Sequence, residues 1–385
     1  MSSKVAIVGV GYTPFRSITP DNSFREMVFE AATKAFEDAG GIHPQSDIDA
    51  FVTCQDDFEH GRSIWNMQTP DNLGAVLKAV NTVPGDGILG LLDAYMQISA
   101  GLRNVVAVET HSKASNMLTR SYMTALAMDP VYNRPLGHNA YFIAGMEMNR
   151  YLSETGAKKE QCALVVTKNR ENALFNPLAA YGGRFSKEEV LSSDEVFYPL
   201  NQLDISSMAD GGIVMVLASE ERAKALNDKP IWIKGVGWCT DAPSLETREW
   251  GEAVYAKLAG EMAYKMAGIK QPSKEIDFAE VDDTFSYKEL QHMEALKLCH
   301  RGQAGDMVEA GATQREGELP VNVSGGSLGV GNLVEATGSQ KVLEAVLQLR
   351  GEAGRRQLAD VKLGIAQSWR GIPYASGAVI ILGKE

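Results

Sequence analysis

Cysteine is scarce in this sequence, and its few copies lie far apart. The 385 residues include only four cysteines, Cys54, Cys162, Cys239 and Cys299. None of them belongs to a Cys-x-x-Cys pair, so the pattern predicts neither a disulfide framework nor a zinc site. We therefore expect no bound metal.

Long apolar runs and an excess of positive charge are also missing. No apolar run approaches the roughly 18 residues of a membrane-spanning helix. The formal net charge of −12 at pH 7 argues against a nucleic-acid or anionic-membrane surface, although a local basic pocket can still bind a small anion. The segment KVAIVGVGYTPF predicts a strand almost at the N-terminus and leaves no room for a signal peptide, so we expect a soluble, cytoplasmic protein.

What the sequence does contain is an internal repeat. A buried-strand run, an amphipathic helix and a second strand occupy residues 4–13, 24–40 and 47–54. The same order recurs as IWIKGVGWCT, WGEAVYAKLAGEMAYKMAG and EIDFAEVDDTF. Both helices end in Ala-Gly, and Ile-Asp follows each after the same interval. This agreement of residue type and spacing predicts a duplicated unit.

The rest of each unit repeats as well. Residues 87–112 predict a Gly turn, a helix and a strand, and residues 331–352 predict a Gly turn and a helix before the strands VKLGIAQS and GAVIILG. Each half is thus expected to be β-α-β-α-β, with two mixed sheets and helices between and outside them. We place the halves at residues 1–228 and 229–385, and interpret residues 112–195 as a lid or binding excursion in the first half.

Three segments resemble the thiolase superfamily, and within it the sterol-carrier-protein-type and archaeal thiolases. They are MADGGIVMVLAS, PVNVSGGSLGVGNLVEATG and VDDTFSYKELQHMEALKLCHRGQAGD. The resemblance follows the whole chain in order. It implies an α/β protein of the thiolase fold, with the two halves forming a layered α-β-α-β-α core.

The sequence departs from this family where the family carries its chemistry. Pro84 stands where thiolases have the nucleophilic Cys, and Asn332 stands where they have a catalytic His. The turn that often carries a second Cys reads Ser368-Trp369-Arg370-Gly371. Because a Pro cannot form an acyl-enzyme, the resemblance implies thiolase chemistry without a covalent Cys intermediate.

Several residues remain as candidates for acid–base work. Asp282, Asp283 and Tyr287 follow a predicted strand end, where reacting groups collect in α/β sheets. Asp282 and Asp283 align with the His-Asp of the family. Either carboxylate could instead bind backbone, and Tyr287 could instead pack in the core. Asn332 keeps a hydrogen-bond donor but cannot shuttle protons, and could simply cap a turn.

A second set is expected to bind substrate or a developing oxyanion. The backbone N–H groups of the helix start at residues 85–88 could face an oxygen, or could simply begin the helix. The resemblance adds the Gly-rich loop, and His111 as a residue behind the site near a dimer interface. The predicted binding set is Gly85, Gly87, His111, Ser324, Gly325, Gly326 and Tyr374.

The resemblance implies an acyl-CoA acyltransferase that cleaves or forms a C–C bond of a bulky β-ketoacyl-CoA, such as an aromatic one. Coenzyme A is then a substrate, with no covalently bound cofactor, and it attacks directly. The chain is similar to the two-subunit thiolases, such as benzoylsuccinyl-CoA thiolase. We therefore expect a homodimer of the thiolase fold that works with a separate zinc-ribbon/OB-fold acyl-CoA-binding subunit.

Two alternatives stay open at this point. One is a retro-aldolase acting on a β-hydroxyacyl-CoA, as in the Cys-less thiolase-like aldolases, with Tyr287 in the central role. The other is a catalytically silent thiolase-fold scaffold subunit. The glycines retained at both turns weigh against the silent subunit.

Overall fold

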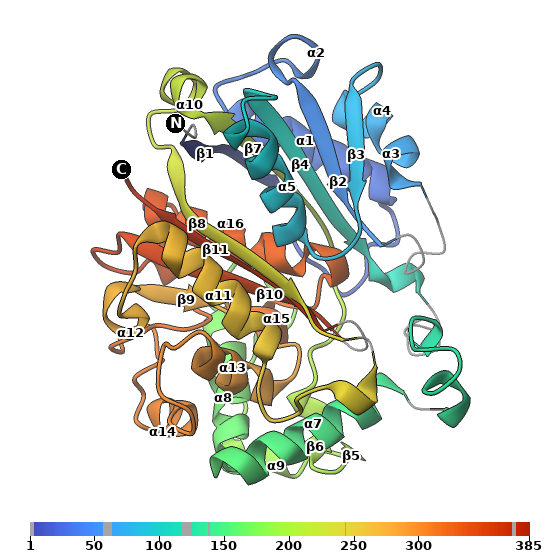
Figure 1. Ribbon diagram of the computed structural model, residues 1–385, viewed down its shortest axis with the longest axis vertical. Helices are drawn as coiled ribbons and strands as arrows, with labels where there is room; N and C mark the ends of the chain where they lie inside the picture. Colours follow the sequence, from blue (N-terminus) through green and yellow to red (C-terminus); the bar gives the residue numbers. More distant parts are fainter. Residues whose placement is uncertain (1–3, 57–63, 118–124, 138, 243, 372–374) are drawn as a thin grey trace.

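The computed structural model describes residues 4–56, 64–117, 125–137, 139–242, 244–371 and 375–385. Figure 1 shows the N-terminal elements in blue and cyan, the C-terminal elements in yellow to red, and green helices at the far end of the C-terminal half. In the described part of the chain, no helix is long and apolar enough to cross a membrane.

The N-terminal half begins with a predicted strand and helix that the structure confirms. Ser23 caps the first helix with a capping box, and the apolar face of this helix packs on the strands. The main elements are β1 (Val5–Tyr12), α1 (Phe24–Asp38), β2 (Ala50–Cys54), β3 (Ala79–Val83), α5 (Gly87–Ser99), β4 (Val105–Lys113) and β7 (Asp210–Ser219). Short helices α2 (Pro44–Asp47), α3 (Trp65–Gln68), α4 (Pro70–Leu73) and α10 (Glu220–Leu226) connect them.

The C-terminal half repeats this succession, again as predicted. Its main elements are β8 (Ile231–Thr240), α11 (Val254–Ala267), β9 (Phe278–Glu280), α16 (Thr337–Arg350), β10 (Leu363–Arg370) and β11 (Ser376–Gly383). Between β9 and α16 the chain forms α13 (Ser286–Ala295), α14 (Ala304–Glu309) and α15 (Gly326–Val330), and α12 (Pro272–Glu275) precedes β9.

The strand order shows the duplication in three dimensions. The N-terminal strands are ordered β2-β4-β7-β1 and the C-terminal strands β9-β10-β11-β8, and β3 is added at the N-terminal edge. In both halves the first pair is parallel and the next two pairs are antiparallel. The prediction of two separate sheets needs one correction. β1 and β8 pair through two residues each, so the strands of the two halves form one continuous nine-stranded sheet.

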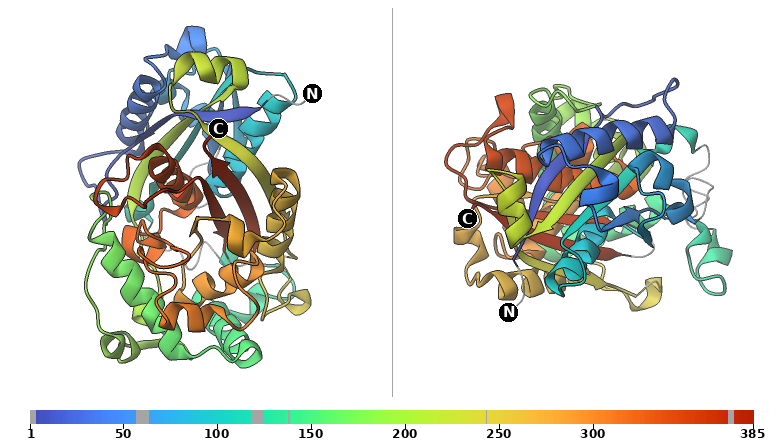
Figure 2. Two further views of the ribbon diagram at one scale, coloured as in Figure 1. Left: turned by 90° about the vertical axis from the view of Figure 1, so that its left-hand side faces the viewer. Right: turned by 90° about the horizontal axis from the view of Figure 1, so that it is seen from above.

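Five layers result from this arrangement, as the resemblance implies (Figures 1 and 2). Helix α1 covers the outer face of the N-terminal strands and α11 covers that of the C-terminal strands. Helices α5 and α16 contact each other and pack on the inner faces of both sets of strands. Every residue of α16 is buried, because this helix has neighbours on all sides. The N-termini of α5 and α16 therefore meet at the centre.

The excursion after β4 extends beyond the predicted residue 195, because β7 begins at Asp210. It contains α7 (Ala140–Thr155), α8 (Lys159–Ala173) and α9 (Lys187–Leu191), with a small sheet of β5 (Glu195–Phe197) and β6 (Leu200–Asn201). Helix α8 packs on α13, α14 and α15 of the other half. The excursion thus covers the segment that contains the candidate residues after β9.

Candidate functional site

The turn before α5 contains no nucleophile. Pro84 follows β3, and its imide nitrogen has no hydrogen to donate. Asp86 is the N-cap of α5, and its Oδ1 accepts a hydrogen bond from the Ile88 N–H at 3.1 Å. One of the N–H groups predicted to face an oxyanion is therefore already bound by a side chain of the protein.

Cys54 lies directly beneath this turn, at the end of β2. Its Sγ donates to the Asp86 carbonyl oxygen at 3.0 Å, and the residue is 0% exposed. Burial raises the pKa of the Cys54 thiol well above its ordinary value. Cys54 therefore stays a protonated thiol and cannot replace the missing nucleophile, because the thiolate is the reactive form.

The Asp86 side chain joins the two halves of the molecule. Its Oδ2 accepts from the Gly338 N–H of α16 at 2.9 Å. A Cβ on Gly338 would lie 1.8 Å from Asp86 Oδ1 and 2.8 Å from Ser368 Cβ, so only glycine fits there. The sequence prediction does not include Asp86, although an Asp just before a helical run is a typical N-cap signal.

Asp86 also has an unusual proton affinity. The pKa of Asp86 is raised to about 6, chiefly because burial disfavours the charged form. The nearby Asp282 carboxylate adds to this rise, and hydrogen bonds from Ile88, Ser368 and Gly338 oppose it. The group therefore titrates close to neutral pH.

Asn332 lies next to the same helix start. Its Oδ1 accepts from the Val334 N–H at 2.9 Å and lies 3.5 Å from Thr337 Oγ1, at the first residue of α16. Its Nδ2 donates to Ser206 Oγ at 3.3 Å. A carboxamide nitrogen carries two hydrogens, so this contact leaves the second one for another acceptor. The structure thus brings Asn332 and Asp86 to the N-terminus of α16.

Asp282 reaches this region from β9. Its N–H donates to Gln367 Oε1 at 2.9 Å, one residue before Ser368, and its Oδ1 accepts from the Thr284 N–H at 2.9 Å. Asp282 is 1% exposed, and among the described residues its Oδ2 has no hydrogen-bond partner. Burial raises the pKa of this carboxyl, and the positive charge of Lys341 opposes the rise. Asp282 thus has a buried carboxyl oxygen that the protein leaves unbound.

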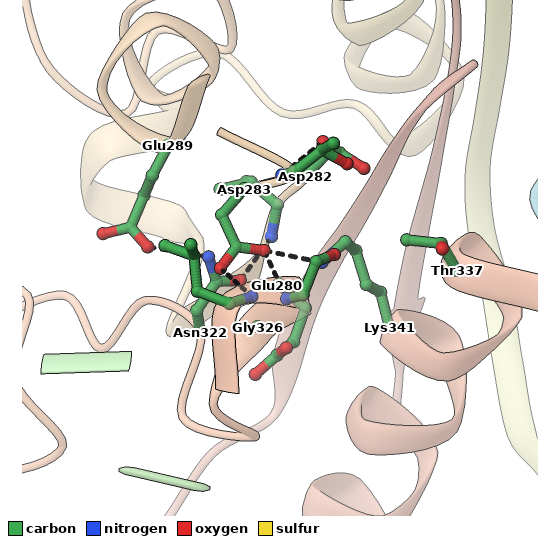
Figure 3. A network of polar contacts seen from close by, with 12 residues as sticks. Glu280, Asp282, Asp283, Glu289, Asn322, Gly326, Thr337 and Lys341 are labelled. Carbon is green, nitrogen blue, oxygen red and sulfur yellow. Dashed lines mark hydrogen bonds and ion pairs between the residues drawn. The ribbon is translucent and has the colours of Figure 1, made fainter. Parts of the chain in front are cut away.

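Asp283 differs from its neighbour, because protein groups surround its carboxylate. The Ser327 and Leu328 N–H groups of α15 donate to it at 2.5 and 3.2 Å, and Asn169 of α8 donates at 2.8 Å. Lys341 of α16 lies 3.3 Å from Oδ1. Figure 3 shows Asp283 at the centre of this buried network. We therefore interpret Asp283 as the group that fixes α15 against α8 and α16.

The Gly-rich loop of the prediction belongs to the same network. Ser324 Oγ donates to Glu280 Oε2 at 2.6 Å and accepts from the Gly326 N–H at 3.1 Å. Gly326 has a φ of +56°, and a Cβ there would lie 2.1 Å from Asp283 Oδ2. Gly325, with a φ of +106°, packs against Ala173 of α8. These contacts assign the loop glycines to the tight turn that starts α15.

Lys341 supplies the positive charge at the centre of three acidic residues (Figure 3). Burial lowers the pKa of its ammonium, but Asp283, Asp282 and Glu280 outweigh that effect, so the net shift is upward. Burial and the negative charge of Glu344 raise the pKa of Glu280. The ammonium therefore stays charged and compensates the acids behind the site.

Tyr287 points into a different network. Its hydroxyl donates to Glu147 Oε2 of α7 at 2.7 Å, and Glu147 Oε1 also binds Lys288 at 2.8 Å. Burial and the Glu147 charge raise the pKa of Tyr287 well above its usual value. The cluster lies in the core that α7, α11 and α13 share, and not in the core between α5 and α16. This placement does not bring the Tyr287 hydroxyl to the α5 turn.

A chain of hydrogen bonds connects this second network to the backbone of Asp282. Lys288 donates to Tyr255 Oη at 3.1 Å, and Tyr255 Oη and His292 Nε2 lie 2.9 Å apart. His292 Nδ1 lies 2.8 Å from the Asp282 carbonyl oxygen, which only accepts, so Nδ1 carries the proton. Burial and the Lys288 charge lower the pKa of His292, which is therefore neutral.

The two remaining residues of the prediction are His111 and Tyr374. His111 lies on the α1 side of β4, where its ring stacks on Phe24 and its Nδ1 lies 2.6 Å from Glu109 Oε1. Its strand neighbours Val106 and Val108 face the α5 side instead. Tyr374 lies outside the described residues. Within those residues, no group of three His, Cys, Asp or Glu side chains is arranged to hold a metal ion.

Comparisons with known proteins agree with the fold. Residues 240–384 match the family described as Thiolase C-terminal domain-like. An acetyl-CoA acetyltransferase of Methanothermobacter thermautotrophicus is 31% identical over 374 residues, which cover 94% of this chain and 95% of that protein. Human sterol carrier protein 2 is 30% identical over 399 residues, which cover 98% of this chain and 71% of that protein.

Two solved structures add to this similarity. A structure described as an Ltp2-ChsH2(DUF35) aldolase has a TM-score of 0.84 and 26% identity, and the match covers 100% of this chain and 98% of that one. Human mitochondrial 3-ketoacyl-CoA thiolase in complex with CoA has a TM-score of 0.75 at 16% identity, over 100% of this chain and 98% of that one. The second similarity concerns the fold alone.

Proposed function

Because the chain belongs to the thiolase family, we propose that it cleaves or forms a C–C bond of a β-ketoacyl-CoA without an acyl-cysteine intermediate. One observation carries the proposal. The starts of α5 and α16 meet, Pro84 stands where the resemblance places the nucleophile, and Cys54 beneath it is buried as a thiol. The second substrate must then attack the acyl group directly.

The reaction balances without a covalent enzyme intermediate. The sulfur of free CoA loses its proton and adds to the β-carbonyl carbon of the β-ketoacyl-CoA. The bond between the α- and β-carbons then breaks, and its electron pair leaves as the enolate of the departing acyl-CoA. One proton on the α-carbon of that enolate completes the reaction and yields two acyl-CoA molecules.

The described residues suggest how the site serves these steps. Asp282 has a buried, unbound carboxyl oxygen and a raised pKa, so it can hold the proton that the enolate receives. The free hydrogen on Asn332 Nδ2 can donate to an oxyanion that develops during the addition. Because no covalent acyl transfer to a buried turn is needed, a bulky acyl group such as an aromatic one can react.

The membership in the thiolase family supports two proposals about binding partners. We infer a homodimer of the thiolase fold and a separate zinc-ribbon/OB-fold subunit that helps to bind the acyl-CoA. The aldolase with a TM-score of 0.84 is named as Ltp2-ChsH2(DUF35), that is, with a second component. Co-purification of this chain with a second small subunit would test the heteromeric proposal.

The test of the reaction uses benzoylacetyl-CoA as an aromatic β-ketoacyl-CoA. With free CoA, the purified protein and any co-purifying subunit should yield benzoyl-CoA and acetyl-CoA. Initial rates should show the intersecting pattern of a ternary complex, and intact-protein mass spectrometry should detect no acyl adduct. Parallel rate lines or a thioester adduct would contradict the direct attack.

Asn332→Asp provides the matched variant for this assay. It keeps the oxygen that accepts from Val334 but removes the Nδ2–H donor. We expect kcat to fall by about 10²-fold, as for other oxyanion donors. Circular dichroism should show that the variant still folds, because the turn keeps its acceptor. A variant with wild-type kcat would exclude Asn332 as the donor.

A second candidate is a retro-aldolase, which the similarity to the aldolase structure favours. That reaction removes the proton of a β-hydroxyl, breaks the same C–C bond and releases an aldehyde or ketone without consuming CoA. Incubation with a β-hydroxyacyl-CoA alone therefore separates the two functions. If neither substrate reacts with or without a second subunit, the result supports a silent scaffold subunit.

A further inference from the structure

The main chain of Asp282 is held on both sides by buried side chains, and the proposed reaction does not yet account for this arrangement. We propose that His292 is a positioning residue, which fixes the Asp282 carbonyl group and so directs the free oxygen of the Asp282 carboxyl. The consequence for catalysis rests on the proposed function, because Asp282 is the proton donor in that reaction.

Strand pairing does not hold this part of the main chain. The pairing of β9 with β10 ends at Glu280, which lies opposite Ala366. At Asp282, side chains take the place of strand partners. Gln367 Oε1 accepts from the Asp282 N–H at 2.9 Å, and His292 Nδ1 donates to the Asp282 carbonyl oxygen at 2.8 Å. Both side chains belong to residues that are 0% exposed, so solvent does not compete for these contacts.

The imidazole of His292 is itself fixed at its other nitrogen. Nε2 accepts from Tyr255 Oη at 2.9 Å, and Tyr255 Oη in turn accepts from Lys288 Nζ at 3.1 Å. Lys288 also donates to Glu147 of α7 at 2.8 Å. The centroids of the Tyr255 and Trp369 rings lie 5.9 and 6.4 Å from that of the imidazole. Hydrogen bonds at both nitrogens and packed rings beside them therefore hold the imidazole in one orientation.

With its main chain fixed, the Asp282 side chain has little freedom left. The Thr284 N–H donates to Oδ1 at 2.9 Å, and Oδ2 has no hydrogen-bond partner among the described residues. The proposed reaction assigns the proton for the enolate to this free oxygen. A displacement of a reacting group by about 1 Å can cost about 10²-fold in rate. His292 therefore acts on the reaction through the placement of Asp282, without touching the substrate.

Asp283 shows the opposite arrangement, although it is the next residue in the chain. Donors from Ser327 and Leu328 of α15 and from Asn169 of α8 surround its carboxylate. The protein thus holds Asp283 by its side chain and Asp282 largely by its main chain. The second arrangement leaves a carboxyl oxygen available at a fixed position, and a proton donor requires both.

Two substitutions of His292 separate the two hydrogen bonds of its ring. Asn places a carboxamide nitrogen at the position of Nδ1, so His292→Asn keeps the donor to Asp282 and loses the acceptor for Tyr255. Gln places a carboxamide oxygen at the position of Nε2, so His292→Gln keeps the acceptor for Tyr255 and loses the donor to Asp282. Both variants lose the buried ring, so both should have a lower melting temperature.

The benzoylacetyl-CoA assay then compares the folded variants, below their melting temperatures. We expect His292→Asn to stay within about threefold of the wild-type kcat, and His292→Gln to lose about 10- to 100-fold. The KM for benzoylacetyl-CoA should stay close to the wild-type value in both variants, because His292 does not contact the substrate. Tyr255→Phe is the matched control. It removes the same hydrogen bond as His292→Asn, from the tyrosine side, and should also keep its kcat.

Crystal structures of the two His292 variants test the positioning without any turnover. The Asp282 carboxyl should be displaced in His292→Gln and should stay in place in His292→Asn. A displacement in both variants, or in neither, overturns the inference. If the carboxyl moves in His292→Gln alone but kcat does not change, the placement by His292 stands and the proposed role of Asp282 fails. If wild-type enzyme does not consume CoA at all, the proposed function fails, and the two structures still decide the inference.

Discussion

Pro84 shows how much one residue changes the chemistry of this site. It stands where the resemblance places the nucleophile and has no backbone donor, while Asp86 binds the Ile88 N–H group that we had expected to face an oxyanion. Cys54 lies near enough to suggest a replacement, but its thiol is buried and its pKa is raised. These positions are why we propose a reaction without a covalent cysteine intermediate.

Tyr287 and Tyr151 allow a matched prediction at the same scale. Both hydroxyls donate to a buried or half-buried glutamate, Glu147 at 2.7 Å and Glu294 at 2.9 Å. Tyr287→Phe should lower the free energy of unfolding by about 1–3 kcal/mol, because Glu147 loses a buried partner. Tyr151→Phe should behave in the same way. We expect kcat of both variants to stay within about threefold of wild type.

Chemical denaturation and steady-state kinetics on the two variants check this prediction. A large loss of kcat confined to Tyr287→Phe, with an unchanged unfolding midpoint, would restore Tyr287 as an acid–base residue. That result would also favour the retro-aldolase, in which a tyrosine was expected to be central.

At the scale of secondary structure, the short helix α15 depends on residues from other elements. Its first N–H groups are bound by Asp283, which follows β9, and Asp283 is in turn held by Asn169 of α8 and Lys341 of α16. A five-residue helix has few hydrogen bonds of its own and is unstable in isolation. The buried carboxylate therefore orders the loop that follows it.

Removing either charge of the Asp283–Lys341 pair should destabilise the protein. Asp283→Asn leaves Lys341 without its closest counter-charge in a buried site, and we expect a loss of about 3–5 kcal/mol in unfolding free energy. Adding Lys341→Met removes the unpaired ammonium. The double variant should therefore lose less than the sum of the two single variants.

Urea unfolding of the wild type, both single variants and the double variant measures this coupling. Additive losses would contradict the prediction, and would show that Asp282 and Glu280 compensate Lys341 without Asp283. Lys341→Met alone should be the milder single change, because Asp283 keeps its N–H donors from α15 and Asn169.

At the scale of the whole molecule, the site exists only because two similar halves meet back to back. Ion pairs connect segments that are far apart in the sequence, namely the partly buried Arg350–Asp38 pair at 2.7 Å and the buried Arg370–Asp56 pair at 2.6 Å. The central helices approach each other closely at Gly87 and Ser339. The geometry around Asp86 depends on that approach.

Enlarging residue 87 and shrinking residue 339 tests whether the site depends on this close approach of the two helices. Gly87→Ala should cost about 1–3 kcal/mol of stability through overpacking, and should lower turnover because it separates the two helix starts. Ser339→Gly in the same chain should recover part of both losses by making room. Ser339→Gly alone should cost about 1 kcal/mol through its lower helix propensity and leave turnover nearly unchanged.

Calorimetry and the benzoylacetyl-CoA assay report both effects. If Gly87→Ala keeps full activity and stability, the two helices can separate without harm to the site. If the double variant is less stable or less active than Gly87→Ala, then Ser339 contributes to the contact through more than the space that it fills.

The repeated strand and helix patterns were sufficient to predict the architecture. Apolar runs such as IWIKGVGWCT and the capped helix after Ser23 appear in the structure at the expected places. The site was harder to predict. The structure places Asn332 at the start of α16, whereas Tyr287 and His111 lie in other networks. Asp86 was missed because an N-cap signal does not show whether the cap is buried. The catalytic and binding roles themselves stay predictions.

The sequence by itself determined that the chain folds as two β-α-β-α-β halves, because hydrophobic periodicity and helix caps act over short distances along the chain. It also predicted that no cysteine acts at the expected turn, because the resemblance places Pro84 there. Only the tertiary structure decided which polar groups meet. The raised pKa of Asp86 and the unbound oxygen of Asp282 arise from burial between helices that are about 250 residues apart, as the Asp86–Gly338 separation of 252 shows. Desolvation is a property of packing, and no local pattern carries it.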